Sequence, residues 1–250
     1  MTFKDHFSGH AGDYAVFRPH YPAELSAWLA SLTVGHDLAW DAGCGNGQAA
    51  AALADHFLAV FATDPSAEQI SHAQRHEHVN YSVEPAEKCS FPDRSADLVV
   101  VAQALHWFDI PAFYREVDRV LRPGGVLAVW TYWWQNITPK IDEIVNERYR
   151  EAVASYWPPE RQLVEDQYRT LIFPYPEITI PPFTMQQDWT LSQLVGYLHS
   201  WSATKRYEKE QGQDPVELIL QDLRKAWGDP RLPRRVVWPL YLRVGRKANV

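Results

Sequence analysis

The chain has little cysteine and no long apolar run. Its 250 residues include only two cysteines, too few for a disulfide framework and consistent with a reducing compartment. No stretch approaches the roughly 20 apolar residues of a membrane-spanning helix, and the first residues lack the apolar centre of a signal peptide. We therefore expect a cytoplasmic protein without membrane contact.

Positive charge is scarce as well. Lysine and arginine number 24 against 31 acidic residues, which gives a formal net charge of -7. Because nucleic-acid binding depends on a basic field, we expect no nucleic-acid partner. The composition is ordinary for a globular protein, whose core at this length needs neither disulfide nor metal, and no metal site is predicted.

Tryptophan is the residue present in excess, with 11 copies. Many of the aromatic residues lie outside the predicted strands. This distribution indicates an aromatic-lined pocket in addition to an aromatic core.

Strand and helix patterns alternate between residues 37 and 130. Such alternation is typical of a parallel sheet covered on both faces. The predicted strands span residues 38–41, 59–63, 79–83, 98–102 and 126–130, and helices begin near Gln48, Ser66 and Pro111.

The most informative stretch joins the first strand to a helix through three alternating glycines. It reads Ala39-Trp40-Asp41-Ala42-Gly43-Cys44-Gly45-Asn46-Gly47. Glycine permits positive φ and the close approach of a ligand, and the helix behind the loop offers free N–H groups. The loop therefore predicts a nucleotide-like ligand.

The spacing of the glycines narrows the choice of ligand. The dinucleotide fingerprint is G-x-G-x-x-G, whereas this loop has G-x-G-x-G. The Asp41 carboxylate would repel a pyrophosphate and favours an amine-bearing ligand. Asp64, about 20 residues beyond the loop at the end of the second strand, is placed to accept the ribose hydroxyls of an adenosine. Its alternative role is to cap the next helix, a role that Ser66 could also take.

With the motifs that follow it, this loop resembles motif I of the class I S-adenosylmethionine-dependent methyltransferases. The ordered motifs span about residues 7–130. More narrowly, three segments resemble the methyltransferase type 11 group that includes the trans-aconitate methyltransferases: the N-terminal block of residues 7–19, Leu105-His106-Trp107-Phe108 and Ser200-Trp201-Ser202-Ala203. The late motif of that family corresponds here to Arg122-Pro123-Gly124-Gly125, which we expect to end a helix with a glycine cap and lead into the fifth strand.

The resemblance implies an α/β fold, a Rossmann-like doubly wound sheet of seven strands with the last strand antiparallel, and helical lid insertions. It divides the single domain, residues 1–250, into an N-terminal helical cap (1–36), a cofactor-binding core (37–130), helical lid insertions with one sheet strand (131–235) and a final strand (236–250). Within the lid, residues 138–173 read as helical with an interruption at Tyr156-Trp157-Pro158-Pro159, residues 183–189 as the strand, and residues 191–227 as further helical segments.

The resemblance also implies the cofactor, S-adenosylmethionine, with S-adenosylhomocysteine as product. Arg18 would pair with the carboxylate of the cofactor, Tyr14 shares its helix face, and the backbone near Glu87 would read the adenine edge. The full predicted cofactor set is Tyr14, Arg18, Asp41, Gly43, Cys44, Gly45, Asp64, Pro65, Ala86, Glu87, Gln103 and Ala104.

The acceptor side is predicted around His106 and Trp107. His106 is the candidate general base for a hydroxyl or amine acceptor, whereas a carboxylate acceptor needs no base because it is already ionised. Alternatively, His106 is structural and Trp107 belongs to the core. Further candidate contacts to a small organic acid are Trp133, Trp134, Trp201, Lys205 and Arg206, although the two cations could equally be solvated.

The predicted function is therefore methyl transfer from S-adenosylmethionine to a small molecule, with an organic acid carboxylate as the leading candidate. Two alternatives stay open from the residues alone. One is a nicotinamide-dependent oxidoreductase, which would share Asp64 and the sheet. The other is a non-catalytic protein that binds an adenosyl ligand.

Overall fold

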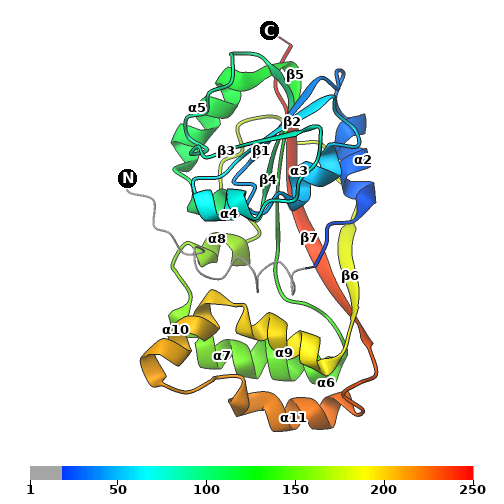
Figure 1. The fold of residues 1–250 in the computed structure, drawn as a ribbon, viewed down its shortest axis with the longest axis vertical. Coiled ribbons are helices and arrows are strands. Elements are labelled where there is room, and N and C mark those ends of the chain that lie inside the picture. The colour runs from blue at the N-terminus through cyan, green and yellow to red at the C-terminus, as the bar shows by residue number, and fades with distance from the viewer. Residues whose placement is uncertain (1–18, 250) are drawn as a thin grey trace.

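The structure is a computed structural model that describes residues 19–249. Seven strands form one sheet in the order β3-β2-β1-β4-β5-β7-β6 (Figure 1). Neighbouring strands among β1 to β5 are parallel, and β7 runs antiparallel to both β5 and β6. This confirms the predicted sheet. The strands are β1 (Leu38–Ala42), β2 (Ala59–Thr63), β3 (Val79–Ser82), β4 (Ala96–Ala102), β5 (Leu121–Tyr132), β6 (Phe183–Trp189) and β7 (Arg234–Arg246).

Both faces of the sheet are buried, as an apolar strand pattern requires. Successive residues of β4 alternate between the faces: Leu98 and Val100 join one apolar cluster, and Val99 and Val101 join the other. Helices α2 (Ala23–Ser31) and α3 (Gln48–Leu53) cover the first face, and α5 (Ile110–Val120) covers the second.

The helices of this core begin where their capping residues allow. The Ser66 hydroxyl accepts a hydrogen bond from the Gln69 N–H at the start of α4 (Ala67–Ser71), and the Asp109 carboxylate accepts one from the Ala112 N–H at the start of α5. Each bond satisfies an N–H that has no partner within the helix.

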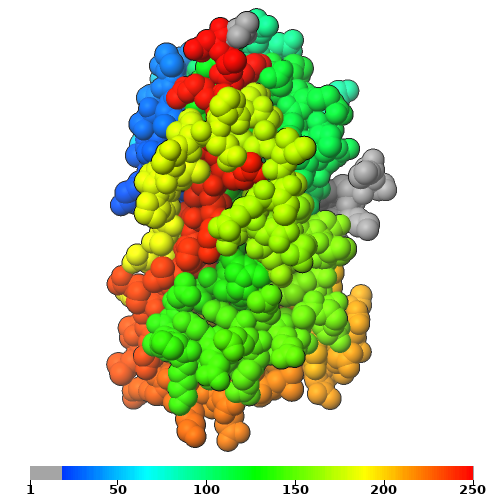
Figure 2. All heavy atoms as spheres, turned by 180° about the vertical axis from the view of Figure 1, so that it is seen from behind, coloured from blue at the N-terminus to red at the C-terminus, as the bar shows by residue number. Residues whose placement is uncertain are grey.

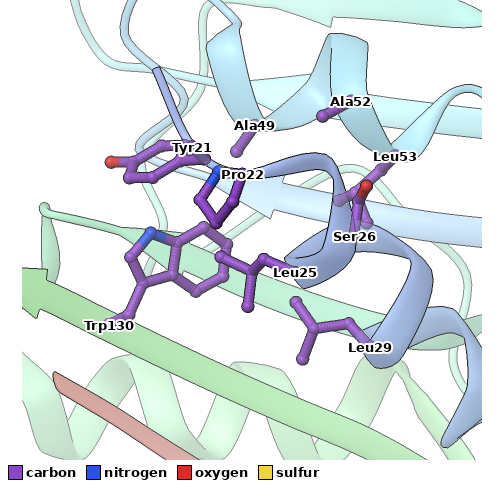
Figure 3. A pocket seen from close by; sticks show the side chains of 9 residues that line it. All are labelled: Tyr21, Pro22, Leu25, Ser26, Leu29, Ala49, Ala52, Leu53 and Trp130. Atoms are coloured by element: carbon purple, nitrogen blue, oxygen red, sulfur yellow. The ribbon is translucent and has the colours of Figure 1, made fainter. Parts of the chain in front are cut away.

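A small apolar pocket lies between α2, α3 and β5 (Figure 3). Tyr21, Leu25, Ala49 and Trp130 are among the side chains around it. Its lining is apolar apart from the Tyr21 and Ser26 hydroxyls and includes no carboxylate. It is therefore no site for an adenosyl ligand, which needs acceptors for its amino and ribose groups.

The predicted glycine cap of the fifth helix is wrong. Helix α5 ends at Val120, and its cap residue Leu121 is extended. The chain reverses only at Gly124, whose φ is +76°, and β5 already begins at Leu121. The helix ends before the glycine because Leu121 already pairs with Ala96 of β4. The register then shifts before Val126 pairs with Leu98.

The last strand holds together parts of the chain that are far apart in sequence. Arg246 donates hydrogen bonds to the backbone oxygens of Gly124 and Leu32. On the back of the molecule, the segment around Glu177 and Ile178 lies beside β7 (Figure 2). There the Ile178 N–H donates to the Val244 oxygen, and Arg243 forms an ion pair with Glu177 at 2.7 Å.

A group of helices lies beyond the sheet, where the parallel strands end (Figure 1). We call this group the helical layer. Its members are α6 (Pro139–Asp142), the π-helix η2 (Glu143–Tyr149), α7 (Arg150–Val153), the 3₁₀-helix η3 (Ala154–Tyr156), α9 (Leu191–His199), α10 (Ser202–Gln211) and α11 (Glu217–Trp227). Trp201 is buried within it against Tyr149 and Tyr197.

Helix α8 (Arg161–Glu165) is separate from the helical layer and packs on the 3₁₀-helix η1 (Leu105–Trp107) after β4. The predicted helical pattern to residue 173 therefore extends too far. Gln167 and Tyr168 have φ angles of 56° and 58°, a left-handed conformation that ends a helix and is unfavourable for side chains of this size. Complete burial of the Tyr168 ring offsets that strain.

Candidate active site

The predicted site residues gather at the carboxyl ends of the parallel strands. In open α/β sheets ligands bind outside these ends, where the strand order reverses. Here the order reverses between β1 and β4. The glycine loop follows β1, Asp64 follows β2, Glu87 lies beyond β3, and Gln103 follows β4.

The glycine loop turns sharply at three points. Gly43, Gly45 and Gly47 have φ angles of 70°, 53° and 80°, which glycine adopts without strain. The loop is also packed: a Cβ at Gly43 would lie 2.8 Å from the Ala104 Cβ, and one at Gly47 would lie 2.1 Å from the Tyr81 hydroxyl. At Gly45 the nearest heavy atom to such a Cβ would be 3.8 Å away, so this is the most open of the three positions.

Asp41 is a buried carboxylate at the base of the glycine loop. Its exposed fraction is 0%, and neither oxygen has a hydrogen-bond partner among residues 19–249. Burial, with a smaller contribution from the charge of Asp64, raises the pKa of Asp41 to about 7. The Ala50 N–H, which lies near the carboxylate without meeting hydrogen-bond geometry, opposes that rise. A buried carboxylate without partners is costly, and a ligand that donates hydrogen bonds would relieve that cost.

Asp64 links the loop to the next helix. One carboxylate oxygen accepts from the Gly45 N–H at 2.9 Å, and the other accepts from the Ser66 N–H at 2.8 Å. The helix cap itself is Ser66. Both bonds hold the carboxylate at the carboxyl end of β2, beside the glycine loop.

The loop beyond β3 contains Ala86, which is buried, and Glu87, which is half-buried. The Glu87 carboxylate accepts a hydrogen bond from the Asp109 N–H at 2.8 Å. That bond fixes the loop against the start of α5 and leaves the backbone as the part available to a base edge.

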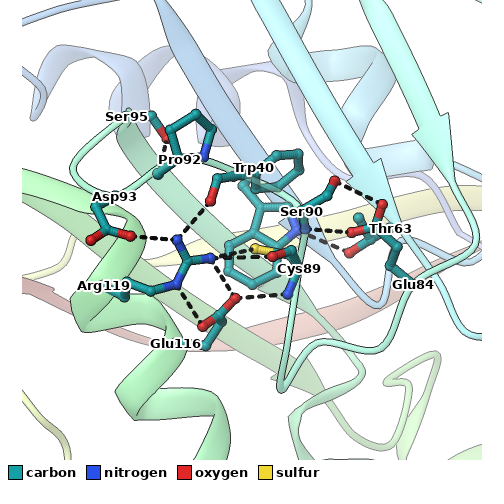
Figure 4. Close-up of polar contacts among 11 residues, drawn as sticks. Trp40, Thr63, Glu84, Cys89, Ser90, Pro92, Asp93, Ser95, Glu116 and Arg119 are labelled. Atoms are coloured by element: carbon teal, nitrogen blue, oxygen red, sulfur yellow. Dashed lines mark hydrogen bonds and ion pairs between the residues drawn. The ribbon is translucent and has the colours of Figure 1, made fainter.

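A charged network supports this same loop from α5 (Figure 4). Glu116 accepts from the Cys89 N–H at 2.7 Å, and Arg119 donates to Glu116 at 2.7 and 2.9 Å. Arg119 also donates to the Phe91 oxygen and to the Asp93 carboxylate. The bonds to Arg119, helped by the Cys89 N–H, lower the pKa of Glu116 to about 2.

Gln103 and Ala104 follow β4 directly. Gln103 has a positive φ of 58°, and its side-chain oxygen accepts from the Thr131 hydroxyl and the Tyr132 N–H, both at 2.8 Å. Its amide side chain therefore joins the ends of β4 and β5. Ala104 is the closer of the two to the glycine loop.

His106 and Trp107 lie side by side on η1, with ring centroids 4.6 Å apart. His106 is buried, and its Nδ1 lies 2.9 Å from the Tyr168 hydroxyl. Burial, reinforced by the positive charge of Arg161, lowers the pKa of His106 to about 3. The ring is therefore neutral at physiological pH and is a weak base.

The other residues predicted to contact the methyl acceptor or the cofactor lie in different surroundings. Trp133 and Trp134 follow β5, and Trp134 packs on the buried Trp201 at 5.1 Å between centroids. Arg206 donates to the Tyr156 oxygen at 3.4 Å. Lys205 lies half-buried on α10. Tyr14 and Arg18 fall outside the described residues.

Two residues near this edge carried no local signal in the sequence. Tyr168 bonds His106 across 62 positions, and the Arg161 guanidinium stacks between Trp133 and Trp157. Only the fold brings these segments together. The Glu116 and Arg119 pair could have been recognised, because residues three apart on a helix share one face.

Comparisons with known proteins identify the class. The model of the methyltransferase domain family matches residues 40–129. A protein of Dictyostelium discoideum named as a methyltransferase is 35% identical over 253 residues, which cover 98% of this chain and 96% of that protein. With the fold described above, this relationship shows that the chain belongs to the class I S-adenosylmethionine-dependent methyltransferases.

Two further comparisons agree. A Saccharomyces cerevisiae protein named as an S-adenosylmethionine-dependent methyltransferase is 23% identical over 94% of both chains. A solved structure described as a type II methyltransferase from Anaeromyxobacter dehalogenans has a TM-score of 0.89 and 43% identity, covering 94% of this chain and all of that one. The chain is therefore an enzyme of this class, which excludes the alternative of a nicotinamide-dependent oxidoreductase.

Within residues 19–249, no group of three or more His, Cys, Asp or Glu side chains is arranged to hold a metal. In the same part of the chain, none of the helices combines the length and hydropathy of a membrane span.

Proposed function

We propose that this chain binds S-adenosylmethionine at the glycine loop and transfers its methyl group to a small organic molecule, with a carboxylate as the accepting group. The observation that carries the cofactor assignment is Asp41, a fully buried carboxylate without a hydrogen-bond partner among the described residues. The amino group of the cofactor would supply both the charge and the donors that this carboxylate lacks.

The other residues of the edge fit the same ligand. The Asp64 carboxylate, bonded to the Gly45 N–H beside the loop, would accept from the ribose hydroxyls. A Cβ at Gly45 would meet no heavy atom nearer than 3.8 Å, so a ligand can approach the backbone there, and the backbone near Ala86 and Glu87 would read the adenine. Cys44, Pro65, Gln103 and Ala104 complete the proposed contacts, together with Tyr14 and Arg18 from the sequence.

The cofactor supplies a methyl group on a positively charged sulfur, and the protein aligns the acceptor and excludes water. A carboxylate acceptor is already ionised near neutral pH. A general base works best when its pKa lies near the working pH, and the pKa of His106, about 3, lies well below it. For a carboxylate acceptor we therefore propose no proton transfer by His106. It would be the base only for a hydroxyl or amine acceptor, where its low pKa would make it a weak one.

The acceptor is proposed to be a small molecule and no nucleic acid, because the chain is acidic overall. Trp107, Trp133 and Trp134 are the proposed aromatic contacts, whereas Trp201, deep in the helical layer, supports them through packing. Both cysteines are buried and unpaired, which suits the reducing cytoplasm.

The test is calorimetric titration with S-adenosylhomocysteine, followed by an assay for its release from S-adenosylmethionine across a metabolite panel. We expect micromolar or tighter binding, lost in Asp41→Ala, and turnover with an acid from the panel. Binding without turnover on any acid of the panel would refute the carboxylate acceptor and leave the cofactor assignment standing. Absence of binding at millimolar concentration would refute the proposal.

A further inference from the structure

The loop that follows β3 is closed on itself by one carboxylate. Glu84 begins this loop, and its side chain accepts hydrogen bonds from the Ser90 N–H at 2.8 Å and from the Ser90 hydroxyl at 2.9 Å. The Ser82 hydroxyl, at the end of β3, donates to the same carboxylate at 2.6 Å. Glu84 and Ser90 are six positions apart in the chain (Figure 4). We call these three bonds the Glu84 clasp.

The Glu84 clasp lies beside the proposed cofactor site. The Ser82 oxygen accepts from the Asp64 N–H at 3.3 Å, so the start of the loop is fixed next to the carboxylate that is proposed to bind the ribose. Within the loop, Ala86 is buried. The clasp therefore encloses the backbone of Ala86 and Glu87, which is the part of the loop proposed to read the adenine.

The other carboxylates at this loop attach it to α5 instead. Glu87 accepts from the Asp109 N–H, and Glu116 accepts from the Cys89 N–H. These contacts hold the loop to the body of the protein, whereas the three bonds of Glu84 stay within the loop and the end of β3. Removal of the Glu84 side chain should therefore loosen the loop without separating it from the fold.

The Glu84 carboxylate is ionised at neutral pH. Burial opposes its ionisation, but the bonds from Ser82 and Ser90 outweigh burial and lower the pKa of Glu84. Hydrogen bonds to an ionised group are stronger than those between neutral groups. A binding loop that such bonds already order loses less conformational freedom when its ligand binds, and the affinity for that ligand is higher.

We infer that Glu84 is a positioning residue for the adenine of the cofactor: by holding Ser90, it keeps the backbone of Ala86 and Glu87 ordered before the cofactor binds. This inference rests on the proposed function, because it requires the cofactor to lie at this edge of the sheet. A residue with this role affects recognition of the base and leaves recognition of the methionine half of the cofactor unaffected.

The experiment compares two ligands that differ only in the base. S-adenosylhomocysteine carries adenine, whose N1 accepts a hydrogen bond, whereas S-inosylhomocysteine carries hypoxanthine, whose N1 carries a proton. A backbone ordered to pair with the first base leaves polar groups unpaired against the second, so the site should discriminate between them.

Calorimetric titration measures the affinity of both ligands for the full chain and for the variants Glu84→Ala and Glu84→Gln. Glu77→Ala is the matched control, because the Glu77 side chain is 85% exposed and lies 3.8 Å from His78. Thermal melting verifies that each variant is folded.

We expect the wild type to bind S-adenosylhomocysteine at least about tenfold more tightly than S-inosylhomocysteine. Glu84→Ala should weaken S-adenosylhomocysteine about tenfold and change S-inosylhomocysteine little, so that the discrimination is lost. Glu84→Gln should stay within about threefold of the wild type, because its amide can accept from the Ser90 N–H and donate to the two serine hydroxyls. Glu77→Ala should behave as the wild type.

Hydrogen–deuterium exchange of the ligand-free protein gives a second readout that does not depend on the cofactor. The peptide that contains Ser90 should exchange faster in Glu84→Ala than in the wild type, because its N–H loses the carboxylate that holds it. In Glu84→Gln and Glu77→Ala the same peptide should exchange at nearly the wild-type rate.

Equal discrimination between the two ligands by the wild type and Glu84→Ala would overturn the inference, and so would unchanged exchange at Ser90. Loss of affinity for both ligands by the same factor in Glu84→Ala would show a structural role alone and would overturn it as well. A wild type that binds S-adenosylhomocysteine but does not discriminate refutes the inference and leaves the cofactor assignment standing. A wild type that binds neither ligand refutes both.

Discussion

The Tyr168 hydroxyl lies 2.9 Å from Nδ1 of His106, which connects a residue in a left-handed conformation after α8 to the turn after β4. Both side chains are buried. Each satisfies a polar atom of the other that would otherwise be costly to bury. The bond ties the segment that follows α8 to the turn after β4.

His106 should make the protein sensitive to acid. The unfolded chain takes up this proton near pH 6.5, whereas burial keeps the folded histidine neutral down to about pH 3. Since the unfolded state binds more protons between these values, the free energy of unfolding should fall as the pH falls through them. From pH 7 to pH 5 the contribution of His106 is about 2 kcal/mol.

Urea unfolding of wild type and His106→Asn at both pH values measures this contribution. The variant should lose less stability in acid than the wild type does. An identical loss in the two proteins would show that His106 titrates normally.

Asp41 should change the stability of the protein with pH in the direction opposite to that of His106. Its folded pKa of about 7 lies above the ordinary value of 3.8, so the folded state retains a proton that the unfolded state releases. Stability should therefore fall as the pH rises from about 4 to 7. Without ligand, Asp41→Asn should be more stable than the wild type at pH 8, by up to about 4 kcal/mol. Equal stability at pH 8 would contradict the raised pKa.

The same carboxyl should make cofactor binding pH-dependent. An amino group binds the ionised form of Asp41, so the affinity of the wild type for S-adenosylhomocysteine should rise about tenfold from pH 6 to pH 8. Calorimetry across this range is the measurement. Asp41→Asn should bind weakly at every pH, and a flat profile in the wild type would separate Asp41 from the ligand.

Gly43→Ala should lower the free energy of unfolding by more than the positive φ of Gly43 alone predicts. A Cβ there would overlap the Ala104 Cβ at 2.8 Å and the Phe108 ring at 2.9 Å, which adds about 1–3 kcal/mol of overpacking. Gly212 is the matched control, because its φ is +68° and no heavy atom lies within 4 Å of such a Cβ. Thermal unfolding of the two alanine variants isolates the packing contribution, and equal costs would exclude it.

Arg119→Lys should destabilise the protein by about 2–3 kcal/mol, because a lysine cannot reproduce the several charged hydrogen bonds to Glu116, Asp93 and the backbone. Arg231→Lys, at an exposed pair with Asp229, should leave stability unchanged. Urea unfolding near neutral pH compares them. A small effect of Arg119→Lys would mean that the loop beyond β3 holds without this network.

The core of the fold could be predicted because its signals are local. Buried parallel strands read as short apolar runs, and caps such as Ser66 mark helix starts. The β6 prediction, residues 183–189, agrees with the structure residue by residue. The course of residues 166–173 was missed because its left-handed turn is stabilised by burial of Tyr168 against distant residues.

The residues of the candidate site also fall into two groups: those that the local sequence predicts and those that only the fold brings together. The glycine loop, Asp41 and Asp64 stand next to strand ends and are visible in the sequence. In contrast, the bonds of Gln103 to Thr131 and Tyr132, and the stacking of Arg161 on Trp133, join segments about 28 residues apart. Such contacts follow from tertiary packing and from no local pattern.

The position of β7 between β5 and β6 affects how this enzyme is made in the cell. β6 pairs only with β7 among the described strands, so it has no strand neighbour until β7 has been synthesised. The first five strands all precede β6 in the chain, so they can pair with one another earlier. The half that holds the glycine loop can therefore exist before the other side of the sheet closes, and a stalled ribosome would present β6 as an open edge to chaperones or to aggregation.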